Sequence, residues 1–118
     1  MSKPEEMRDR TKRFALRIIR LFRSLPYRTD TQVLGKQLLR CGTSVAANYR
    51  AVCRARSKAE FIARIGIVAE EADETILWLE LLTESGIIQA ERTKELLAEA
   101  RELAAIFTAS QQTAKKAA

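Results

Sequence analysis

Residues 34–61 read LGKQLLRCGTSVAANYRAVCRARSKAEF, and this stretch decides the fold. Its apolar side chains recur every three or four residues, which is the periodicity of one face of an α-helix. The apolar face consists of Leu34, Leu38, Cys41, Val45 and Val52, with Asn48 or Tyr49 between the last two. This spacing suits a helix that packs against near-antiparallel neighbours in a bundle.

The rest of the chain carries the same periodicity in further segments. We therefore expect an all-α protein, an up-down-up-down antiparallel four-helix bundle that forms a single domain over residues 1–118. The expected helices span residues 4–25, 30–56, 58–85 and 89–110. Residues 111–118 have no apolar anchor, so we expect them to form a disordered tail.

Local signals mark the helix ends. Residues with the spacing of a capping box precede the first three expected helices: Ser2 with Glu5, Thr29 with Gln32, and Ser57 with Glu60. Pro26 ends the first helix, because the residue before a proline avoids the α conformation. Gly86 suits the left-handed position that often follows a helix, so it predicts the end of the third one.

Charge is distributed unevenly along the chain, which carries a net +6. Residues 1–56 hold 14 Lys/Arg against 4 Asp/Glu, whereas residues 57–86 hold 2 against 7. The basic front half predicts an acidic partner such as nucleic acid. A second interpretation, compatible with the first, is that the acidic third helix neutralises part of the first two helices inside the bundle.

Several catalytic classes lack their usual residues. The chain has no histidine, which removes the commonest general base and metal ligand. A di-iron bundle needs Glu-x-x-His on two helices, whereas nearly all the candidate carboxylates lie on one helix: Glu70, Glu71, Asp73, Glu74 and Glu80. We expect no enzymatic activity, no metal and no cofactor.

Cellular location is indicated by the cysteines and by hydropathy. Cys41 and Cys53 lie about 18 Å apart along one expected helix, too far to form a disulfide with each other. They are interpreted as thiols of a reducing compartment. The first residues do not form a signal peptide, and no apolar run approaches the ~20 residues that span a membrane. We therefore expect a cytoplasmic protein with no membrane partner.

Ser44 and Asn48 are four residues apart, so they lie on one side of the same helix. One interpretation makes them a polar core motif whose hydrogen bonds across the interior fix the helix register. The other places them on an exposed groove that binds a ligand.

Basic residues on the first two expected helices could form a phosphate-binding surface. These are Arg10, Arg13, Arg17, Arg20, Lys36, Arg40, Arg50, Arg54 and Arg56. Tyr27 and Tyr49 are the aromatic residues placed to stack on bases. Binding to RNA or DNA would be directed at the phosphate backbone, without sequence specificity and sensitive to salt. The alternatives are a solvated face or a protein-protein adaptor with no nucleic-acid binding.

Residues 33–88 resemble a known family. The motifs that carry the resemblance are GTSVAANY at 42–49, SKAEF at 57–61, EADET at 71–75 and WLE at 78–80. They resemble the four-helix-bundle proteins encoded in intervening sequences of bacterial 23S ribosomal RNA genes. Ser44 and Asn48 correspond to the polar motif of that family.

The resemblance implies a homopentamer without established enzymatic activity. It also implies kinship with the accessory protein of diversity-generating retroelements, which binds a reverse transcriptase and nucleic acid. The expected partners are therefore further copies of this chain, RNA or DNA, and a reverse transcriptase or another protein. Apolar residues off the core-facing side are the candidate subunit contacts, because a lone bundle would leave them exposed: Ile67, Trp78 and Leu81.

Overall fold

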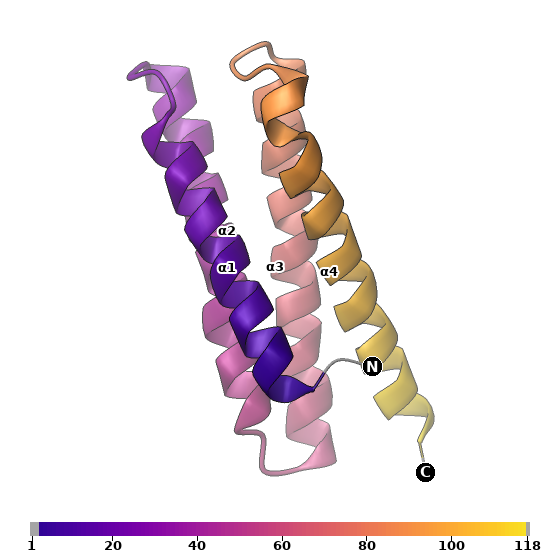
Figure 1. Ribbon diagram of the computed structural model, residues 1–118. Coiled ribbons are helices and arrows are strands. Elements are labelled where there is room, and N and C mark those ends of the chain that lie inside the picture. The colour runs from indigo at the N-terminus through magenta and orange to yellow at the C-terminus, as the bar shows by residue number, and fades with distance from the viewer. Residues whose placement is uncertain (1–2, 118) are drawn as a thin grey trace.

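The computed structural model describes residues 3–117, which form four α-helices. These are α1 (Pro4–Arg23), α2 (Thr29–Cys53), α3 (Lys58–Glu84) and α4 (Ala90–Lys116). Figure 1 shows the α1–α2 and α3–α4 connections at one end of the molecule, and the α2–α3 connection with both termini at the other. The bundle measures 49 × 22 × 20 Å. The expected all-α four-helix bundle is confirmed.

The core is built from the periodic apolar faces of the helices. Its largest fully buried side chains include Phe14, Ile18, Leu38, Leu79 and Phe107. Each helix packs closely on the next along the chain, whereas α1 and α4 meet much more loosely. The first and last helices nevertheless share the apolar core, and long polar side chains at its edge also link them.

Gly42 allows α1 and α2 to approach each other closely. A Cβ atom at this position would lie 2.8 Å from Cγ1 of Ile18, which is closer than carbon atoms pack. The glycine lowers helix propensity by about 1 kcal/mol relative to alanine. Close packing between the two helices explains why that cost is tolerated.

Two helices end two or three residues earlier than expected, and α3 ends one residue earlier. Helix α1 ends at Arg23 rather than at residue 25, and α2 ends at Cys53 rather than at residue 56. At both ends the chain tightens, because the next backbone N–H groups donate to carbonyls three residues back. Residues 54–57 thus form the connection between α2 and α3.

The expected caps have different outcomes. Ser57 caps α3, since its Oγ accepts a 3.0 Å hydrogen bond from the N–H of Glu60. Gly86 has the predicted left-handed conformation, with φ of 85°. The predicted Thr29 cap is wrong, because α2 begins at Thr29 itself and the preceding Arg28 supplies no side-chain hydrogen bond. The Ser2 cap lies outside the described residues.

The expectation of a disordered tail is also wrong for residues 111–116, which continue α4. Gln111 anchors this extension, because its Nε2 donates a 3.1 Å hydrogen bond to the backbone oxygen of Ile62 in α3. The positive charges of Lys115 and Lys116 in the last turn interact favourably with the negative end of the helix dipole. The hydrogen bond from Gln111 to Ile62, rather than an apolar stripe, thus fixes residues 111–116 beyond the end that periodicity predicts for the helix.

Candidate nucleic-acid interface

Three arginines of α1, Arg10, Arg17 and Arg20, lie on the side of the helix that faces α4. Arg10 donates to both carboxylate oxygens of Glu99, each at 2.8 Å, and contacts Glu102 at 2.9 Å. About two and three turns further on, Arg17 and Arg20 line a hollow between α1 and α4 together with Glu91 and Glu95. Charge on α1 is therefore neutralised by the fourth helix, which sequence reasoning did not predict.

The pairing with α4 removes Arg10 from the predicted phosphate-binding surface. Its hydrogen bonds to Glu99 raise the pKa of Arg10 further above its usual value. In return, the Arg10 hydrogen bond lowers the pKa of Glu99, with smaller contributions from Arg17 and Arg13. Because the side chains of Arg10 and Glu99 are both mostly buried, their charges neutralise each other in an ion pair.

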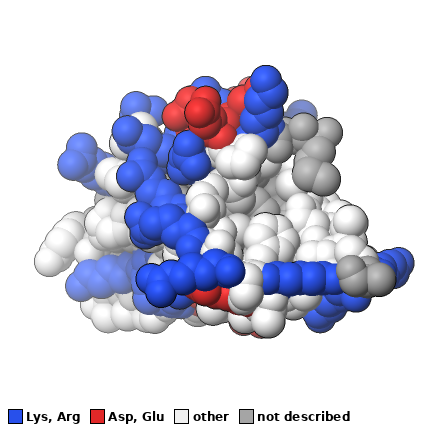
Figure 2. Space-filling model, turned by 90° about the horizontal axis from the view of Figure 1, so that it is seen from below, with Lys and Arg blue, Asp and Glu red and all other residues white. Residues whose placement is uncertain are grey.

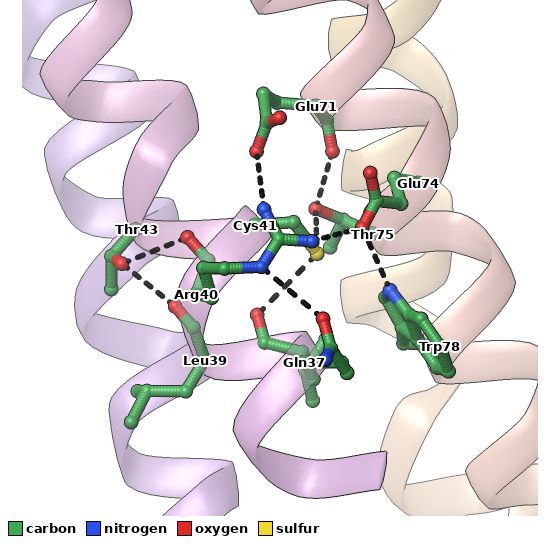
Figure 3. Close-up of polar contacts among 10 residues, drawn as sticks. Gln37, Leu39, Arg40, Cys41, Thr43, Glu71, Glu74, Thr75 and Trp78 are labelled. Atoms are coloured by element: carbon green, nitrogen blue, oxygen red, sulfur yellow. Dashed lines mark hydrogen bonds and ion pairs between the residues drawn. The ribbon is translucent and has the colours of Figure 1, made fainter.

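Arg40 is likewise paired, in this case with carboxylates of α3. Figure 3 shows its guanidinium group reaching from α2 to the carboxylates of Glu71 and Glu74. Trp78 Nε1 donates a 3.2 Å hydrogen bond to Glu74, which holds that carboxylate between the indole and the guanidinium group. The expected neutralisation of α2 by the acidic α3 is confirmed at this position.

Glu71 and Cys41 lie beneath this surface network. Burial raises the pKa of Glu71, and its buried Oε2 accepts no hydrogen bond although Arg40 lies 3.6 Å away. Burial also raises the pKa of the Cys41 thiol, whose sulfur lies 3.2 Å from Oγ1 of Thr75. Cys41 is therefore a packed, unreactive thiol between α2 and α3.

Ser44 and Asn48 do not form the expected polar core motif. Both are only half-buried, and neither side chain has a hydrogen-bond partner among residues 3–117. Ser44 lies about 100° around the helix from the fully buried Val45, which turns it toward the flank of α2. The interior position between Val45 and Val52 is taken by Tyr49, whose ring packs 5.6 Å from that of Phe107.

Basic residues gather at the end of the bundle that contains the α2–α3 connection and both termini. We call this set the basic end: Arg50, Arg54, Arg56, Lys58, Lys115 and Lys116. Figure 2 shows Lys and Arg side chains spread over this end with few acidic side chains between them. Residues 31–59 contain no Asp or Glu, so α2 brings no acidic residue to it.

The arginines of the basic end differ from Arg10 and Arg40. Arg50, Arg54 and Arg56 are exposed, and none of their guanidinium groups forms an ion pair within the described part of the chain. The backbone N–H of Arg56 donates to Oε2 of Glu60 at 3.2 Å. Lys58 Nζ donates to the backbone oxygen of Ala117, which draws the start of α3 and the end of α4 together. Lys115 and Lys116 were missed from the sequence because their tail was expected to be disordered, and Lys58 was not among the predicted basic residues of the first two helices.

The remaining predicted site residues are separated from the basic end. Lys36 is exposed in the first half of α2, toward the opposite end of the bundle. Tyr27, one of the expected stacking residues, is 92% exposed in the α1–α2 connection at that opposite end. Only Tyr49 lies near the basic end, where burial raises its pKa to about 12 and keeps its hydroxyl neutral.

The candidate subunit contacts lie together on the outer face of α3. Ile67 is 46% exposed and Leu81 40%, and Leu77 is exposed to a similar degree. Trp78 is half-buried, because its indole packs beside the Arg40–Glu74 pair. Exposed apolar side chains of α3 therefore precede and follow Glu71 and Glu74 along the helix.

Two searches of the described residues give negative results. Within residues 3–117, no group of three or more His, Cys, Asp or Glu side chains is arranged to hold a metal ion. None of the helices in that range combines the length and the apolar character that crossing a membrane requires.

Comparison with known proteins places the chain in a family. Residues 5–109 match the family described as 23S rRNA-intervening sequence protein. The chain belongs to this family. A crystal structure of a protein of unknown function from the S23 ribosomal protein family of Bacteroides thetaiotaomicron VPI-5482 is similar, with 33% sequence identity and a TM-score of 0.85. The similarity covers 94% of this chain and 99% of the other.

No curated protein matches the chain. The family resemblance of residues 33–88 is thus confirmed, and it extends over nearly the whole bundle. The family's similar structure carries no assigned activity, so the function of this member is argued from its own residues.

Proposed function

We propose that this 23S rRNA-intervening sequence protein is a non-enzymatic, homo-oligomeric scaffold that binds RNA or DNA without sequence specificity through its basic end. The observation that carries the proposal is the contrast between two sets of arginines. Arg10 and Arg40 are paired with carboxylates of neighbouring helices, whereas Arg50, Arg54 and Arg56 have no such partner among the described residues.

Unpaired arginines are suited to phosphate groups. A guanidinium group binds phosphate through two parallel hydrogen bonds, and no internal ion pair has to break first. Arg13, Arg17, Arg20 and Lys36 add positive charge at longer range, but the glutamates of α4 offset much of the α1 contribution. We therefore place the strongest phosphate contacts at the end of α2 and in residues 54–57.

The salt dependence of binding tests the proposal. Fluorescence anisotropy with labelled RNA and DNA at about 50 mM salt and above should give affinities that fall steeply as salt rises. The triple variant R50E/R54E/R56E should lose most of this binding. The matched control R13E/R17E/R20E also reverses three charges, on α1, and should lose less. Absence of binding at about 50 mM salt would refute the nucleic-acid part of the proposal.

A protein-binding adaptor is the competing function. The exposed apolar side chains of α3 favour a protein contact, and we propose that further copies of this chain cover them in a pentamer. A pentamer would also repeat the basic end five times, which strengthens binding to a long polyanion through multivalency. If nucleic acid does not bind while an acidic protein does, the adaptor function replaces the scaffold proposed here.

A further inference from the structure

Two hollows open side by side at the basic end. One has a volume of about 180 Å³ and the other about 480 Å³, and both are lined by Pro4, Tyr49 and Phe61. The smaller hollow continues between α1 and α4 to Ile106, and the larger continues along the α2–α3 connection to Arg56. Together they make one groove that is lined by apolar side chains at one end and by Arg56 at the other.

The groove differs in its charge from the hollows between α1 and α4. No Asp or Glu lines either part of it. By contrast, the hollows between α1 and α4 that contain arginine also contain glutamate, Glu91 and Glu95 in one and Glu6 and Glu102 in the other. A ligand that is both apolar and anionic therefore fits the groove at the basic end and not those hollows. A further hollow without Asp or Glu, lined by Tyr27, Arg28 and Lys36, lies at the opposite end of the bundle, but it has only one aromatic side chain.

Tyr49 and Phe61 give the groove two aromatic side chains that are only half-buried. The Tyr49 ring is held in place by the buried ring of Phe107, whose centroid lies 5.6 Å away at an interplanar angle of 34°. A ring held in this way presents a surface for stacking without a large loss of side-chain entropy on binding.

The geometry points to the unpaired base of a single-stranded RNA or DNA as the occupant of this groove, with the adjacent phosphates on Arg54 and Arg56. A duplex keeps its bases stacked on each other and offers only phosphates, whereas a single strand offers both. This inference rests on the proposed function, because it uses the same basic end. It adds the prediction that the protein distinguishes single strands from duplexes.

Binding by variants with the aromatic rings removed tests the inference. Anisotropy titrations compare a labelled single strand, as RNA and as DNA, with a blunt duplex of the same length. Y49L and F61L keep an apolar side chain and should weaken single-strand binding about 5- to 150-fold, the range that one lost stacking contact gives. Duplex binding should not change. Y27L, which alters an exposed tyrosine at the opposite end, is the matched control and should bind like the unchanged protein.

A second measurement uses the unchanged protein, so it does not depend on how well the variants fold. Single strands that carry a photoreactive 5-iodouracil should cross-link to Tyr49 or Phe61, as located by mass spectrometry of the digested adduct. Thermal unfolding followed by circular dichroism shows whether Y49L and F61L retain the bundle.

The outcomes separate this inference from the proposed function. Equal affinity for single strand and duplex, or cross-links confined to Tyr27 and other distant residues, overturns the base-binding groove while salt-sensitive binding at the basic end stands. If neither nucleic acid binds at about 50 mM salt, both fail. Polyglutamate that binds as tightly as the oligonucleotide shows that charge alone is recognised, and this too overturns the inference.

Discussion

Arg10 and Glu99 join the first helix to the last through two parallel hydrogen bonds, each of 2.8 Å. The two residues are 89 positions apart in the sequence, and their side chains are 23% and 19% exposed. Because the backbones of α1 and α4 approach each other less closely than those of helices adjacent in the chain, this pair is a long-reaching polar link between them.

Replacement of Glu99 by Gln should destabilise the protein by about 1–2 kcal/mol, since the charged hydrogen bonds to Arg10 are partly screened from water. Arg10 lowers the pKa of Glu99, so the ionised carboxylate stabilises the folded state above its unfolded pKa, and this stabilisation is lost as pH falls through the lower folded value. Urea unfolding of E99Q and the unchanged protein between pH 7 and pH 3 measures it. E95Q, on the exposed part of the same helix, is the control. Equal stability of E99Q and the unchanged protein at pH 7 would contradict the role of the pair.

Glu71 should show the opposite dependence on pH. Burial raises its pKa above the usual 4.5, so the folded state favours the protonated carboxyl and ionisation at neutral pH costs stability. The cost is present above the folded pKa and disappears as pH falls through it toward the unfolded value. The unchanged protein should therefore gain stability on mild acidification, and E71Q should not show this gain. Urea titrations at closely spaced pH values between 7 and 4 measure this gain, and E70Q on the exposed side is the control. An identical pH profile for E71Q would show that Arg40 compensates the burial completely.

Gly42 and Gly66 predict contrasting effects of alanine. At Gly42 the new methyl group would meet the branched side chain of Ile18 at 2.8 Å, so G42A should destabilise the bundle by about 1–2 kcal/mol despite its better helix propensity. At Gly66 the methyl group would displace only the flexible amide end of Gln111, so the lost hydrogen bond to Ile62 and the gain in helix propensity, about 1 kcal/mol each, should offset one another. G66A should therefore be close to neutral. Thermal unfolding of both variants measures the difference, and a G42A protein as stable as G66A would refute close packing at Gly42.

The outer face of α3 should control assembly. Light scattering coupled to size exclusion should give about five times the 13.3 kDa chain mass for the unchanged protein. I67E and L81E should reduce this mass toward that of a monomer, because a buried charge would oppose the contact. L16E is the matched control, since Leu16 and Leu81 are both 40% exposed but lie on different helices. A monomeric unchanged protein, or dissociation by L16E alone, would place no subunit contact on α3.

Sequence reasoning and structure agree for most local signals, although the Thr29 cap is an exception. The apolar faces, the Ser57 cap and the left-handed Gly86 each depend on residues within a few positions of one another, and all are confirmed. The candidate site was predicted less well. Pairing of Arg40 with the acidic third helix was expected, whereas pairing of Arg10 with Glu99 of α4 was not, because no local pattern relates residues so far apart along the chain.

The sequence by itself determined the four helices, their apolar seams and the family, because helix periodicity and motif spacing are properties of neighbouring residues. Only the tertiary structure decided which arginines remain free, where Ser44 and Asn48 lie, and that residues 111–116 continue α4. These features depend on how far each helix is rotated about its axis and how closely it approaches its neighbours. Contacts such as Gly42 against Ile18 and Gln111 against Ile62 set that rotation and approach, and they join residues that no sequence period relates.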